Sequence, residues 1–241
     1  MKKTLCLLLA VILSLSAVVF AGCGNDGDNS SAASDAKSSA ASTDTDTDTD
    51  TEKETLSSDM QAIADSLDVK EYRVTGLEYE HIVFVITNNS KTDCALEVDV
   101  NFYDKDKNVV DTQDEQLEAI GAGQTSVMAV YANEKFESYT YDFIPYESSY
   151  YVAVTKDLDL KVEEGDNKLT ASVTNNGTAT ALFTTVNTLF FKGDEVLYFD
   201  KSYVGDDNTE IAPDKTETKE IMNFTDSDRY ETYLNSYAKA E

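Results

Sequence analysis

The sequence predicts an all-β protein with two similar sandwich domains in tandem, and three observations support this prediction. Several segments alternate apolar and polar residues, the clearest of them from Cys94 to Phe102. Such alternation is typical of strands with one buried face. Turn-forming residues separate these segments roughly every 8 to 12 residues. Finally, several motifs occur twice in the same order, at a separation that grows from 87 to 94 residues.

Residues 1–22 have the pattern of a secretory signal peptide. Two lysines precede an apolar run from Leu5 to Phe20, which is marginally short for a membrane-spanning helix. The run leads into Ala21, Gly22 and Cys23, and this ending resembles the lipobox of bacterial lipoproteins. The resemblance implies cleavage before Cys23 and lipidation of its sulfur. The expected location is therefore the outer face of a bacterial cell membrane, reached through a lipid anchor.

Residues 23–58 are expected to form a disordered acidic linker. They consist almost entirely of Gly, Asn, Asp, Ser, Ala, Thr, Lys and Glu, with Leu56 as the single large apolar residue. Such a segment cannot bury enough apolar surface to offset the entropy lost on ordering. We expect it to hold the folded part of the protein away from the membrane.

Cysteine usage indicates that the exported protein has no disulfide. Cys6 is removed with the signal peptide and Cys23 is the expected lipidation site, so Cys94 remains as a single thiol. One thiol cannot pair within the chain, and we expect no disulfide-linked partner. Cys94 opens an alternating strand pattern, which favours a small core residue over a reactive one.

The two expected domains span residues 59–150 and 151–241. The first is expected to begin with a short helix, because Met60, Ile63 and Leu67 fall on one helical face, with Ser58 or Asp59 as its N-cap. Tandem duplication explains the repeated motifs, such as Val85–Ser90 with 172–177 and Phe136–Tyr139 with 230–233. Short strands separated by turns favour an immunoglobulin-like β-sandwich for each copy.

One motif set resembles a known family. The first copy contains Val100-Asn-Phe102-Tyr103-Asp104, then Asn108-Val-Val and Gly121-Ala-Gly-Gln-Thr125, and the second copy contains Thr188-Leu-Phe-Phe-Lys192. This order is similar to that of the bacterial FxLYD-type extracellular domain, over residues ~70 to 237. The resemblance implies a surface β-sandwich with no assigned chemistry.

The sharpest candidate for a ligand site is the segment from Asp104 to Glu115. Its oxygen-bearing residues Asp104, Asp106, Asn108 and Glu115 occupy positions 1, 3, 5 and 12, as in a calcium-binding loop. Position 6 is Val109, where such loops require Gly for a sharp bend. A polar hairpin turn is the alternative, and the sequence favours it.

Aromatic residues cluster between Tyr139 and Tyr151 and again between Tyr198 and Tyr237. Aromatic side chains can stack on sugars or anchor a partner, but alternating aromatics also fill sandwich cores. We expect most of them to be core residues. The cluster from Tyr146 to Tyr151 is expected to form a packed seam between the two domains.

Composition excludes several classes of function. The chain has 46 acidic and 19 basic residues, a net charge of −27, of which −22 falls on residues 59–241 with 37 acidic and 15 basic residues. Nucleic-acid binding is excluded, because it needs clustered Lys and Arg. A single His and the lack of catalytic motifs argue against an enzyme and against a cofactor.

The resulting hypothesis is a lipid-anchored, non-enzymatic cell-surface protein. Its two domains would present loops or an edge strand to a protein or cell-wall partner, one that is neutral or basic given the acidity of the chain. Two alternatives are a calcium-binding surface module and a lipoprotein that captures a ligand for a transporter. The second alternative needs a deep cleft between two α/β lobes, and the sequence lacks the helical periodicity for such lobes.

Overall fold

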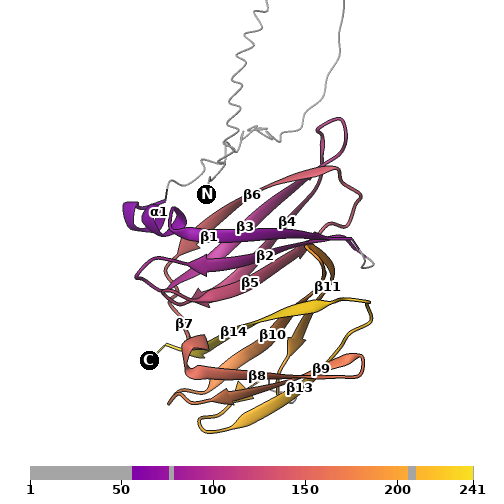
Figure 1. The fold of residues 1–241 in the computed structure, drawn as a ribbon. Helices are drawn as coiled ribbons and strands as arrows, with labels where there is room; N and C mark the ends of the chain where they lie inside the picture. The colour runs from indigo at the N-terminus through magenta and orange to yellow at the C-terminus, as the bar shows by residue number, and fades with distance from the viewer. Residues whose placement is uncertain (1–55, 76–78, 206–209, 241) are drawn as a thin grey trace, which may run out of the picture. The chain divides into compact units, whose positions relative to one another are not determined.

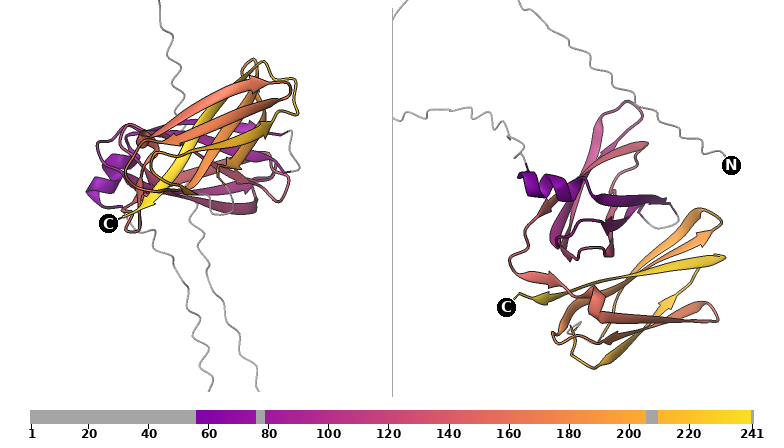
Figure 2. Two further views of the ribbon diagram at one scale, coloured as in Figure 1. Left: turned by 90° about the horizontal axis from the view of Figure 1, so that it is seen from below. Right: turned by 60° about the vertical axis from the view of Figure 1, so that its left-hand side comes forward.

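The computed structural model describes residues 56–75, 79–205 and 210–240, which lie within one compact unit, Glu52–Glu241. The fold is all-β, as predicted. Its four main sheets are antiparallel and form two sandwiches, seen one above the other in Figure 1 and from two further directions in Figure 2. No described sheet combines strands from both sides of residue 150.

The first sandwich packs a sheet of order β1-β2-β5 against a sheet of order β4-β3-β6. Its core consists of the inward side chains of both sheets, with Phe84 of β2 and Phe102 of β3 fully buried. Its elements are α1 (Ser58–Ala64), β1 (Leu67–Val74), β2 (His81–Asn88), β3 (Cys94–Tyr103), β4 (Val109–Ile120), β5 (Thr125–Tyr131) and β6 (Ser138–Tyr146).

The second sandwich packs a sheet of order β13-β9-β8 against a sheet of order β11-β10-β14-β7, in which the short β12 also pairs with β10. Its core includes Val173 of β9 and Phe190 of β10. Its elements are β7 (Tyr151–Ala153), the 3₁₀ turn η1 (Thr155–Asp157), β8 (Leu158–Gly165), β9 (Lys168–Asn175), β10 (Ala181–Lys192), β11 (Glu195–Tyr203), β12 (Glu210–Ile211), β13 (Thr216–Met222) and β14 (Arg229–Lys239).

The internal repeat is visible in the way each copy ends its second strand. Asn88 closes β2 and Asn175 closes β9, and both side chains are buried. Asn88 donates to Thr92 O at 2.9 Å and accepts from Ser90 N at 3.0 Å. Asn175 donates to Ala179 O at 2.9 Å and accepts from Gly177 N at 2.9 Å. The same side chain therefore satisfies the same turn in both copies, which a shared origin explains.

The alternating pattern of β3 is confirmed. Cys94, Leu96, Val98, Val100 and Phe102 are all buried, whereas the intervening Glu97, Asp99 and Asn101 are half-buried between the neighbouring strands. The sequence also predicted the short N-terminal helix, but its cap is one residue earlier than expected. Ser57 Oγ accepts a hydrogen bond from Met60 N at 3.3 Å, as an N-cap does.

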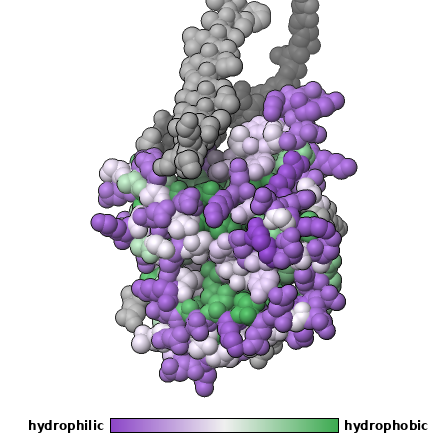
Figure 3. Space-filling view, in the orientation of Figure 1, coloured by the Kyte–Doolittle hydropathy of each residue, from purple (hydrophilic) through white to green (hydrophobic). Residues whose placement is uncertain are grey.

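The aromatic residues of β6 fill the first core, as alternating aromatics were expected to do. The rings of Tyr141 and Phe143 contact the Phe84 ring at centroid distances of 4.8 and 5.3 Å. Of the tyrosines expected to pack between the domains, Tyr151 lies against the first core and contacts the Tyr237 ring, whereas Tyr150 is 78% exposed. Hydrophilic residues cover most of the face shown in Figure 3, and hydrophobic residues show only in limited patches.

Candidate functional site

The expected lipidation residue Cys23, the signal peptide 1–22 and nearly all of the linker 23–58 lie outside the described residues. These expectations therefore remain predictions. Among the helices that the structure describes, none has the length and apolar character needed to cross a membrane.

The four residues of the expected calcium-binding loop do not come together in the structure. Asp104 closes a hairpin turn between β3 and β4, where one carboxylate oxygen, Oδ1, accepts from the backbone N–H groups of Asp106 at 2.8 Å and Asn108 at 2.9 Å. The hydrogen bond from the Asn108 side chain, followed by these backbone bonds, lowers the pKa of Asp104. The Asp104 carboxylate thus stabilises a turn, as the alternative reading had it.

Glu115 lies well away from that turn. It pairs with Val98 in the middle of β3, whereas the turn begins beyond the pair of Tyr103 with Val109. Five strand positions separate these pairs, about 16 Å at the usual rise of a strand. Within residues 56–75, 79–205 and 210–240, no group of three or more His, Cys, Asp or Glu is placed to hold a metal ion.

Cys94 is a buried core residue, as its position in the strand pattern indicated. Burial, with a smaller effect from the Asp93 carboxylate, raises the pKa of the Cys94 thiol to about 11. Since only the thiolate is strongly nucleophilic, this thiol is unreactive in the folded protein at neutral pH.

We expect native Glu52–Glu241, in which Cys94 is the single cysteine, to resist a disulfide thiol reagent at pH 8 and to react fully in denaturant. Burial favours the neutral thiol in the folded state. The associated stability is therefore fully present below the unfolded pKa of about 8.5 and is lost as the pH rises toward 11. Spectrophotometric thiol counting checks this, and stoichiometric native labelling within minutes would contradict it.

A hydrophobic cluster joins the two sandwiches, and we call it the seam. Val83 and Val85 point away from the first core on the outer face of β2, and they meet Leu189 and Phe191 on the outer face of β10. All four side chains are buried. The complete set of buried seam residues is Val74, Val83, Val85, Val127, Leu189, Phe191, Val196 and Phe199.

Phe191 makes two further contacts at the seam. The Phe191 ring meets Tyr72 of β1 edge-on, at a centroid distance of 5.6 Å, and Arg229 of β14 lies over the ring with Cζ at 3.6 Å from the centroid. The two sandwiches thus share a third hydrophobic cluster in addition to their own cores, and a buried apolar contact of this kind opposes relative motion of domains.

The side chain of Asn235 on β14 forms with Val127 of β5 the two hydrogen bonds that a neighbouring strand would form. Its Oδ1 accepts from Val127 N at 3.0 Å and its Nδ2 donates to Val127 O at 2.7 Å. Val127 lies on the outer strand of its sheet, so these backbone groups have no neighbouring strand to pair with. One amide therefore satisfies both groups in a buried position and fixes how the two sandwiches meet.

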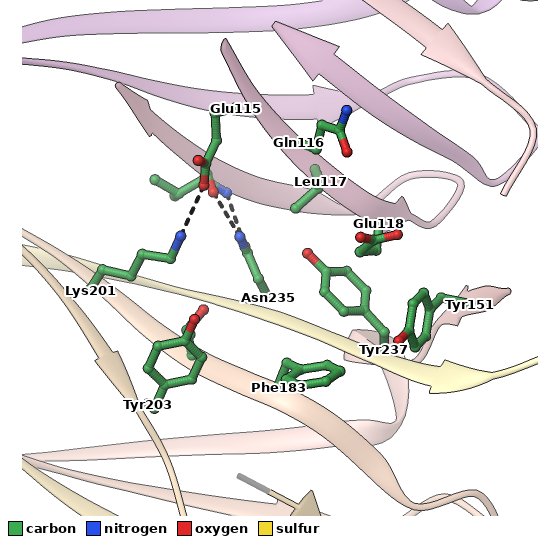
Figure 4. A pocket seen from close by; sticks show the side chains of 12 residues that line it. Glu115, Gln116, Leu117, Glu118, Tyr151, Phe183, Lys201, Tyr203, Asn235 and Tyr237 are labelled. Atoms are coloured by element: carbon green, nitrogen blue, oxygen red, sulfur yellow. Dashed lines mark hydrogen bonds and ion pairs between the residues drawn. The ribbon is translucent and has the colours of Figure 1, made fainter. Parts of the chain in front are cut away.

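Beside this contact the two sandwiches enclose a cleft of about 330 Å³. Figure 4 shows β4 above it and β10, β11, β14 and β7 below it. Lys201 of β11 reaches across to Glu115 of β4, with Nζ to Oε1 at 3.0 Å. The main lining residues are Glu115, Leu117, Glu118, Tyr151, Phe183, Thr185, Lys201, Tyr203, Asn235 and Tyr237.

Phe183 lines the cleft, and the backbone of β10 is distorted at this residue. The register between β10 and β14 shifts between Leu182 and Thr185, and Phe183 has a φ of +50°. This left-handed conformation is costly for a bulky residue. A bulge re-aims a side chain, and here it leaves the Phe183 ring 47% exposed instead of buried in a sheet face.

Tyr237 forms the inner wall of the cleft. It is 8% exposed, and its ring contacts the ring of Tyr151. The Tyr151 ring in turn contacts the Phe183 ring at a centroid distance of 6.2 Å. Burial is the main cause that raises the pKa of Tyr237, a hydrogen bond with the Glu118 backbone lowers it, and the carboxylates of Glu118 and Glu115 raise it. Two acidic residues, Glu115 and Glu118, therefore act on this wall of the cleft.

Sequence reasoning did not find the cleft, although it named Glu115 and the second aromatic cluster. Its lining residues come from six strands, so no local motif marks it. The available signal was that β2 is apolar on both faces from Ile82 to Ile86. Such strands are buried on both sides, which requires a second layer outside the sandwich.

No protein-family model and no curated protein matches the sequence. Among solved structures, the transglutaminase of red sea bream is similar over 70% of this chain and 31% of that chain, with 14% identity and a TM-score of 0.22. This chain thus spans less than a third of that enzyme. A likeness this distant indicates neither a shared activity nor a shared site.

Proposed function

We propose that this protein is a lipid-anchored, non-enzymatic binding protein of the bacterial cell surface. In this proposal the two fused sandwiches present one rigid surface to a protein or cell-wall partner. The observation that carries the binding role is the cleft between them, where Phe183 and Tyr203 are each 47% exposed beside partly buried carboxylates. Rigid aromatic side chains held at a junction are typical of recognition surfaces.

The rigidity of the unit supports the same proposal. Binding to a preformed surface loses less conformational entropy than binding that must first order two domains. In this proposal the seam and the Asn235 contact hold the two sandwiches in one arrangement before any partner binds. A long polar linker of the expected kind would let such a unit reach partners at some distance from the membrane.

The anchor is tested by the Cys23→Ala substitution. In the bacterial host we expect the unaltered chain to begin at Cys23, to carry a diacyl or triacyl modification and to partition into the membrane fraction. We expect Cys23→Ala to prevent both cleavage at that position and lipidation. Mass spectrometry of the N-terminal peptide and membrane fractionation measure the two effects.

Cys94→Ala serves as the control, since it also removes a thiol and leaves the expected lipidation site unchanged. An unaltered chain that is neither cleaved nor lipidated would contradict the anchor. The binding role is tested separately by incubating immobilised Glu52–Glu241 with intact cells and isolated cell wall. A hydrolase or transferase activity of this fragment would contradict the non-enzymatic role.

A further inference from the structure

We infer that the cleft between the sandwiches binds a basic side chain, a guanidinium or an ammonium group, presented by a partner protein. This inference deepens the proposed function, on which it rests, by naming the chemical group that the cleft takes. It depends on three features of the cleft: its aromatic walls, an uncompensated carboxylate and the position of Phe183.

The aromatic walls favour a cation. Four aromatic side chains line the cleft, and two of them, Phe183 and Tyr203, expose nearly half of their surface. The faces of such rings attract organic cations, and the attraction grows when the cation is partly removed from water. A cleft of about 330 Å³ is large enough to enclose the end of a Lys or Arg side chain.

The charge of the cleft favours the same group. Glu115 and Glu118 both line it, and Glu115 is already paired with Lys201. Glu118 is half-buried, and no Lys or Arg among the described residues forms an ion pair with it. Burial is the main cause that raises the pKa values of Tyr146 and Tyr237, and the negative charge of Glu118 contributes to both. A half-buried carboxylate without a cation gains most from a cationic ligand.

The position of Phe183 indicates that the exposed ring is not there for packing. A phenylalanine at φ +50° costs stability, and its ring is not rewarded by burial because it remains 47% exposed. Strain of this kind is typical of sites where a side chain is held for binding. Here it places the Phe183 ring near Tyr151, below the cleft in the view of Figure 4.

Three tripeptides test the inference by NMR titration of ¹⁵N-labelled Glu52–Glu241. The probes are acetyl-Gly-Arg-Gly-amide, acetyl-Gly-Lys-Gly-amide and the citrulline analogue of the first, which keeps its shape but has no charge. We expect the Arg and Lys probes to shift the amides of Glu118, Tyr203 and Tyr237 with millimolar affinity. The citrulline probe is expected to bind at least about fivefold more weakly, since it lacks the charge.

Two variants locate the site. We expect Glu118→Gln and Tyr203→Ala each to lower the affinity for the Arg probe by about three- to tenfold. The matched controls are Glu134→Gln and Tyr131→Ala, outside the cleft, where Tyr131 is 46% exposed against 47% for Tyr203. Both controls are expected to keep the affinity of the unaltered protein. Thermal melting confirms that each variant is folded.

Equal binding of the Arg and citrulline probes would overturn the inference, as would equal losses in the cleft and control variants. Absence of any shift at cleft residues with up to 20 millimolar Arg probe, a concentration well above the expected ~1 mM dissociation constant, would also overturn it. Those results would leave the proposed function standing if the immobilised fragment still captured cells or wall. Loss of both would remove the two proposals together.

Discussion

Phe191→Ala is expected to lower the free energy of unfolding by roughly 3 to 5 kcal/mol, the usual cost of deleting a fully buried ring. Phe191 is 0% exposed and lies at the centre of the seam, where it contacts residues of both sandwiches. The loss includes its edge-on contact with Tyr72 and the cation–π contact with Arg229. Denaturant unfolding of Glu52–Glu241, followed by circular dichroism, measures this change.

The substitution should also change the number of transitions. Each sandwich has a core cluster, and among the described buried residues of the second sandwich only Ala153 and Tyr237 belong to the cluster of the first, so a weakened seam is expected to let one half unfold while the other stays folded. We therefore expect one calorimetric transition for the unaltered protein and two for Phe191→Ala. Phe224→Ala is the matched control, because Phe224 is 76% exposed and its loss should cost no more than about 0.5 kcal/mol.

Two separate transitions in the unaltered protein would show that the seam does not couple the sandwiches. A loss below about 1 kcal/mol for Phe191→Ala would show that the ring is not packed as described, since fully buried rings cost several times more. Either result would also weaken the proposed function, which depends on a rigid unit.

The elements that the sequence predicted correctly are those governed by local pattern. The alternation from Cys94 to Phe102 requires a strand with one buried face, and β3 is that strand. The turns after β2 and β9 fall in the repeated motifs 85–90 and 172–177, which were visible because side-chain capping of a turn involves residues close in sequence. The internal repeat was visible for the same reason, since each copy keeps its own local signals.

The seam and the cleft could not be predicted in the same way. Val83 and Leu189 meet because two outer sheet faces pack together, and no local rule states which apolar face finds which. The left-handed conformation of Phe183 has no glycine to mark it, because the tertiary packing of β10 imposes it. The sequence assigned Glu115 to a loop by spacing, whereas strand pairing carries it to the cleft.

Asn235→Ala is expected to lower the free energy of unfolding by roughly 2 to 4 kcal/mol, because two buried backbone groups lose their partners together. In the folded protein the Asn235 amide satisfies both Val127 N–H and Val127 C=O, at 3.0 and 2.7 Å. Asn235 itself is 5% exposed, so water has little access to replace it. Urea unfolding of the variant measures the loss, and its hydrogen exchange should be faster at the Val127 amide.

Asn235→Asp separates this account from a simple packing effect, because it keeps the shape of the side chain and changes its hydrogen bonding and its charge. An ionised carboxylate can still accept from Val127 N–H, but it cannot donate to Val127 O and faces it as a second acceptor. Burial and this contact raise the folded pKa of the introduced carboxyl above its unfolded value of about 3.9. The variant is therefore expected to be closest to the unaltered protein below about pH 4, and to lose relative stability as the pH rises through the folded pKa. A difference between the two proteins that stays constant from pH 4 to pH 8 would contradict the role assigned to the Asn235 amide, since packing alone does not titrate.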